Sequence, residues 1–158
     1  MGRRPQLADL EATLAQLVPT LARLSELVAL QREAVAEGDL DRLLALTGDQ
    51  EMASARLAAL EARREELQAA LERALGVQGL HAIAAADRAA HAESPLPALV
   101  DALRFEVVRL HEENRRAVAL LGAAAELASR SRAFLARLMG AEVVYPALAG
   151  AGGRGSGA

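Results

Sequence analysis

Apolar side chains recur at alternating steps of three and four residues along the first part of the chain, between residues 6 and 37. This spacing puts them on one face of a helix, at the a and d positions of a heptad repeat. Pro19 removes one backbone hydrogen bond but leaves the spacing in phase, so we expect one helix that continues through it. The positions of this seam are Leu7, Leu10, Leu14, Leu17, Leu21, Leu24, Val28 and Val35.

A Gly-Asp pair separates this segment from a second amphipathic one, residues 40–75. Gly38 suits a helix C-terminus and Asp39 suits an N-cap, which predicts a tight turn. Two long amphipathic helices joined by so short a turn form an antiparallel hairpin. Residues 76–94 offer little apolar bulk, so we expect a mobile connector with only a turn or two of helix.

Ser94 and Pro95 read as an N-cap followed by a first-turn proline, and they predict a third helix over residues 95–139. Asn114 falls on its expected seam. A seam asparagine either fixes the register of a buried helix pair or meets a partner where packing is incomplete, and the sequence leaves both readings open. The first eight expected seam positions are Leu96, Val100, Leu103, Val107, Leu110, Asn114, Ala117 and Leu121.

The predicted fold class is all-α: a long antiparallel helical hairpin plus a long third helix, in an elongated, coiled-coil-like bundle. Residues 1–140 are expected to form a single helical domain. Residues 141–148 are a short apolar segment that contains the only tyrosine, Tyr145. Residues 149–158 consist of Ala, Gly, Arg and Ser and cannot bury apolar area, so we expect a disordered Gly-rich tail.

Composition and charge exclude several kinds of chemistry. The chain has no cysteine, which excludes disulfides, thiolate catalysis and cysteine-ligated metals. The three histidines, His81, His91 and His111, do not share a metal-ligand spacing, so we expect no metal, no cofactor and no enzymatic activity. A net charge of −3 does not suit nucleic-acid binding. No stretch approaches the ~20 apolar residues that span a bilayer, so we expect a cytoplasmic protein without stable membrane insertion.

Four motifs, in this order along the chain, resemble those of the FlgN-type flagellar export chaperones. The first is the Gly-Asp turn with its flanking helices, residues 33–46, and the second is the leucine–arginine pattern of residues 60–64. The third is residues 110–121, where Asn114 matches the second of the family's two asparagines and His111 stands in place of the first. The fourth is Tyr145, followed by a Gly-rich tail.

The resemblance implies a cytoplasmic chaperone of flagellar type III export. Such a chaperone binds the C-terminal helical segments of hook–filament junction (hook-associated) proteins before secretion and releases them at the export apparatus. The implied client surface comprises Asn114, Leu121, Leu135, Leu138, Val143, Val144 and Tyr145. The alternative is a structural or self-oligomerising coiled-coil protein without an export client, and the sequence also leaves a homodimer open.

Overall fold

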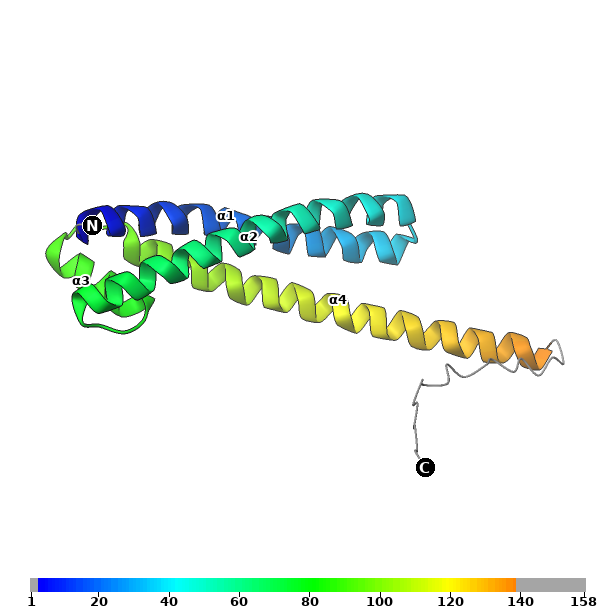
Figure 1. Cartoon of the computed structure of the whole chain (residues 1–158). Coiled ribbons are helices and arrows are strands. Elements are labelled where there is room, and N and C mark those ends of the chain that lie inside the picture. The colour runs from blue at the N-terminus through cyan, green and yellow to red at the C-terminus, as the bar shows by residue number, and fades with distance from the viewer. Residues whose placement is uncertain (1–2, 139–158) are drawn as a thin grey trace, which may run out of the picture. The chain divides into compact units, whose positions relative to one another are not determined.

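The computed structural model describes residues 3–138 of the chain, and the side chains of residues 4–127, 129 and 130. It contains four helices: α1 (Arg3–Glu37), α2 (Leu40–Leu75), α3 (Leu80–Ala90) and α4 (Leu96–Leu138) (Figure 1). No strand occurs in residues 3–138, and the all-α prediction is confirmed. The expected Gly-rich tail, 149–158, lies outside the described residues.

The turn between α1 and α2 forms as the sequence predicts. Gly38 adopts a left-handed φ of 71°, which a residue with a Cβ rarely takes. The Asp39 amide then donates to the carbonyl of Ala34 at 2.9 Å, and the Asp39 carboxylate accepts from the Arg42 amide at 2.9 Å. These bonds satisfy backbone groups at both helix ends, and α1 and α2 lie side by side as an antiparallel hairpin (Figure 1).

Residues 80–90 form the helix α3, which is longer than the turn or two of helix expected between residues 76 and 94. Ile83 and Ala84 are buried there, and Leu80 is partly buried against the core cluster, so two bulky side chains among alanines are enough to dock the helix. Gly79, at a φ of 86°, precedes α3 and donates its amide to the Glu72 carboxylate at 2.8 Å. Hydrogen bonds from Gln68 and Gly79 lower the pKa of Glu72.

The main core cluster lies where all four helices meet, near the start of α1. It holds most of the fully buried leucines together with residues from each of the other helices, and each buried leucine contributes about 1.5–3 kcal/mol. The buried members are Leu7, Leu10, Leu14, Leu17, Leu67, Leu71, Ile83, Ala84, Leu96 and Val100. The first turns of α4 are therefore anchored to the hairpin through apolar contacts.

α1 is buried on a wider face than the predicted heptad seam. Thr13, Thr20, Leu27 and Ala34, seven residues apart, are buried as well. The threonine hydroxyls donate to carbonyls four residues earlier in α1, so their burial leaves no hydroxyl donor without an acceptor. A helix with two buried flanks needs two partners, and α1 packs against both α2 and α4.

Contacts group residues 1–120 into one compact unit and residues 121–158 into a second. The first unit contains α1, α2, α3 and residues 96–120 of α4. The described part of the second unit is residues 121–138 of the same helix. The two units are considered separately below.

Candidate interaction surface on the fourth helix

In the middle part of α4, the residues that turn inward each come one position before a residue of the predicted seam. Val107, a predicted seam position, is 50% exposed, and Asn114, for which the sequence left burial or contact with a partner open, is exposed. Their preceding neighbours turn inward instead: Glu106 is only 9% exposed, and the Glu113 side chain is 15% exposed. Asn114 therefore does not set the register of a helix pair within the described part of this chain.

This rotation leaves large apolar side chains of α4 on the surface. Exposed hydrophobic clusters of this kind commonly mark interaction sites. Val107, His111, Asn114 and Val118 follow one another at steps of four, three and four residues, so they share one face, here named the outer stripe. The large exposed hydrophobic residues of α4 are Phe105, Val107, Val108, Val118, Leu121 and Leu127.

The residues expected at a client surface fall into two groups. Asn114 is exposed in the first unit, and Leu121 is 55% exposed in the second. Leu135 and Leu138 belong to α4, but their side chains lie outside the described ones, as Val143, Val144 and Tyr145 lie outside the described residues altogether. Among the described residues, Phe105, Val108 and Val118 are additional exposed candidates that the predicted seam did not include.

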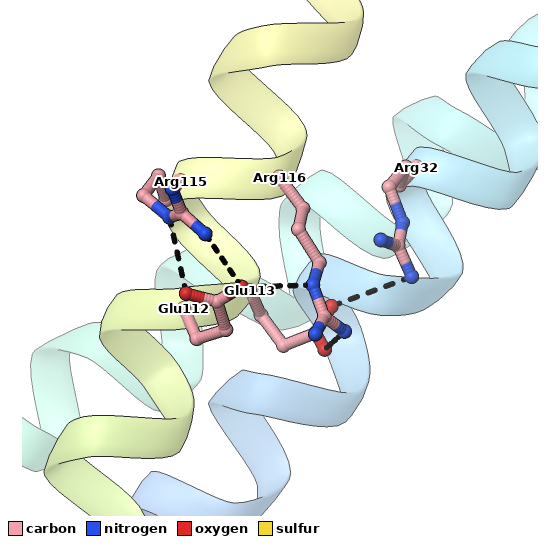
Figure 2. A network of polar contacts seen from close by, with 5 residues as sticks. All are labelled: Arg32, Glu112, Glu113, Arg115 and Arg116. Atoms are coloured by element: carbon pink, nitrogen blue, oxygen red, sulfur yellow. Dashed lines mark hydrogen bonds and ion pairs between the residues drawn. The ribbon is translucent and has the colours of Figure 1, made fainter.

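A polar network lies in the middle part of α4 (Figure 2). Glu112 pairs with Arg115 at 3.0 Å and with Arg116 at 3.1 Å, while Glu113 pairs with Arg116 at 3.0 Å. A hydrogen bond from Arg115 is the main cause of the lowered pKa of Glu112, and the pKa of Arg115 is raised in turn. Only Glu113 reaches another helix within this network, through Arg32 of α1 at 3.4 Å (Figure 2).

A second polar cluster joins α3 to the start of α4. Buried Asp87 accepts a hydrogen bond from the Ser94 hydroxyl and pairs with His91 Nδ1 at 3.0 Å. The Ser94 hydroxyl also accepts from the Leu96 amide at 3.2 Å, which is the N-terminal capping role that the sequence predicts. Both side-chain bonds end on Asp87 rather than linking Ser94 to His91, so the arrangement is a helix cap and not a nucleophile–base pair.

Glu11 of α1 lies close to this cap. Burial and the charge of Asp87 raise the pKa of Glu11, and His91 opposes the shift. A pocket of about 460 Å³ opens here, lined by residues that include Arg4, Glu11 and His91. No group of three or more metal-ligating side chains occurs within the described part of the chain. None of the described helices has a stretch long and apolar enough to cross a membrane.

Fold and surface together define the class: an all-helical protein whose last described helix keeps apolar side chains exposed, an arrangement that suits the binding of a helical partner. The family model described as "FlgN protein" matches residues 1–149. The chain therefore belongs to the FlgN family, and this membership supports a general role as a flagellar export chaperone. Comparisons with curated proteins and with solved structures found no match.

The exposure of Asn114 leads to a direct prediction. Replacing Asn114 with leucine is expected to leave the thermal midpoint nearly unchanged, because the side chain buries little apolar area in the fold. Thermal unfolding followed by circular dichroism checks this. A clear rise in the midpoint would show that position 114 packs against another helix in solution.

Proposed function

We propose that this protein is a cytoplasmic chaperone of flagellar type III export that binds C-terminal helical segments of hook–filament junction proteins before their secretion. Family membership supports the chaperone role. The single observation that supports helix binding is the set of large apolar side chains exposed along α4. A client helix with an unpaired apolar stripe needs a substitute helix partner, and an exposed helix face provides one.

We place the client surface on the distal part of α4 and the segment that follows it. Exposure of Asn114 and Leu121 supports the first part of this assignment. The rest of it rests on the family resemblance of the terminal motif. The proposed client-binding residues are Asn114, Leu121, Leu135, Leu138, Val143, Val144 and Tyr145.

A direct binding experiment tests the proposal. The full chain is mixed with the C-terminal helical segments of hook–filament junction proteins, and complex formation is measured by pull-down and by solution mass. We expect a stoichiometric complex at micromolar concentration. Absence of any complex there would overturn the proposal, and a stable dimer of this chain without client binding would favour the self-oligomerising alternative.

Two substitutions in the proposed surface are expected to weaken client binding without unfolding the protein. These are Tyr145→Ala and Leu121→Asp, and truncation after Gly140 should act like the first. Leu44→Asp is the matched control for Leu121→Asp, because Leu44 is an exposed leucine of α2, a helix that carries none of the proposed client-binding residues. Titration calorimetry measures binding and circular dichroism measures helicity. A large loss of helicity in Tyr145→Ala would instead assign this segment to the core.

A further inference from the structure

The contact between α1 and α4 is apolar near the start of α1 and polar near its end. Leu96 and Val100 join the core cluster near the start of α1, whereas Glu113 pairs with Arg32 near its end. The two helices therefore run in the same direction. One heptad before the Arg32–Glu113 pair, the same register brings Ser25 opposite Glu106, and both of these residues are buried.

Beyond the core cluster, apolar residues of α1 and acidic residues of α4 are buried or partly buried. On α1 the apolar residues include Leu21, Leu24 and Val28. α4 contributes Glu106 and Glu113 on the side that turns toward the hairpin. Within the described residues, buried Ser25 Oγ has no hydrogen-bond partner, and buried Glu113 Oε2 has no hydrogen bond and only the ion pair with Arg32 at 3.4 Å.

A different rotation of α4 would bury more apolar surface. Turning the helix by about 50° about its own axis, half of its 100° step per residue, keeps Leu103, Leu110 and Ala117 facing the hairpin. After this rotation, Val107 would face the hairpin in place of Glu106, and Asn114 would face it in place of Glu113. This alternative is the seam that the apolar spacing predicts. Burial of apolar area by itself therefore favours the rotation that the structure does not adopt.

The cross-helix ion pair favours the observed rotation. Arg32 of α1 points to Glu113 of α4, and Arg116 holds the other carboxylate oxygen of Glu113 (Figure 2). The Glu113 side chain is 15% exposed and that of Arg32 is 31% exposed, so solvent screens this pair less than the surface pairs of Glu112. Rotation by about 50° would turn the Glu113 carboxylate away from Arg32 and break the contact.

We propose that Arg32 and Glu113, supported by Arg116, are positioning residues that set the rotation of α4. By holding Glu113 inward, they keep the outer stripe of Val107, His111, Asn114 and Val118 on the surface, where it can bind an amphipathic client helix. The identity of this partner rests on the proposed function. The rotation itself does not, and it can be tested without a client.

The chain contains no cysteine, so a single introduced thiol reports the exposure of one position. Val107→Cys and Leu120→Cys are made separately, each with and without Arg32→Met. The thiol reaction rate with a maleimide is measured under native conditions. We expect Arg32→Met to slow labelling at 107 several-fold and to speed it at 120, because the predicted rotation buries the first position and exposes the second.

Three further variants test whether the Arg32–Glu113 ion pair itself causes these changes in labelling rate. Arg115→Met removes an exposed cation of the same network that does not contact α1, so it should change neither rate. Arg32→Lys keeps the charge and should restore both rates. Glu113→Gln breaks the same ion pair from the other helix and serves if Arg32→Met does not fold. Unchanged rates in both Arg32→Met and Glu113→Gln would overturn the proposal, as would faster labelling at both positions, which indicates detachment of α4 instead.

Binding of the client segments is then measured for the same variants. Arg32→Met is expected to weaken binding several-fold, and Arg115→Met is expected to leave it unchanged. Slower labelling at position 107 and faster labelling at position 120, without any loss of affinity for the client segments, would overturn the role of the outer stripe in client binding. If the unaltered chain binds no client segment, the proposed function fails, while the labelling rates still decide whether Arg32 and Glu113 set the rotation.

Discussion

Replacing Leu10 with alanine is expected to lower the free energy of unfolding by about 2–5 kcal/mol. The Leu10 side chain is 0% exposed and belongs to the core cluster that joins all four helices. Truncation removes its buried methyl groups and leaves a cavity that the surrounding helices fill only in part. The loss should therefore affect the whole of the first unit.

Urea-induced unfolding followed by circular dichroism measures this loss. Leu44→Ala is the matched control, because Leu44 is a leucine of the same hairpin that is 63% exposed. It should change the free energy of unfolding only slightly. A loss at Leu10 no larger than the loss at Leu44 would contradict the core that the structure shows.

Replacing Asp87 with alanine is expected to cost about 1–3 kcal/mol of stability. The substitution removes the acceptor of the Ser94 hydroxyl and the partner of His91, and it loosens the cap that begins α4. It also removes the negative charge that raises the pKa of Glu11, so that pKa should fall toward its ordinary value.

Two measurements check the Asp87 prediction. Urea unfolding gives the change in stability, and carboxyl titration by NMR gives the pKa of Glu11. Hydrogen exchange should also quicken at the amides of residues 94–97 if the cap is loosened. Asp101→Ala, at an exposed aspartate of α4, is the control. Equal stabilities of the Asp87 and Asp101 variants would show that the buried cap contributes little.

Sequence reasoning succeeded where local chemistry decides the structure. The hairpin turn needs a left-handed glycine and a capping aspartate, and Gly38 and Asp39 supply them within two adjacent residues. Ser94 likewise caps the start of α4 through its own hydroxyl. α3 was predicted only as a turn or two of helix, because its bulky apolar residues are just Leu80 and Ile83 and the burial of Ile83 depends on packing against the other helices.

The candidate surface was predicted only in part, for a related reason. Exposure of Leu121 agrees with its place in the expected client surface, whereas Asn114 was also assigned to a seam that the structure does not bury. Four further exposed hydrophobic residues of α4, Phe105, Val108, Val118 and Leu127, lie off that seam. Periodicity identifies residues that share a helix face, but it does not say which of two neighbouring faces is covered.

The sequence by itself determined the helical class, the hairpin and the approximate boundaries of the three long helices, because spacing, glycines and caps act within a few residues of one another. Only the tertiary structure decided the docking of α3 and the rotation of α4. Leu103, Leu110 and Ala117 are compatible with two rotations about 50° apart, so local spacing does not choose between them. The contact that distinguishes the two joins Arg32 of α1 to Glu113 of α4, residues that meet only after the helices have packed.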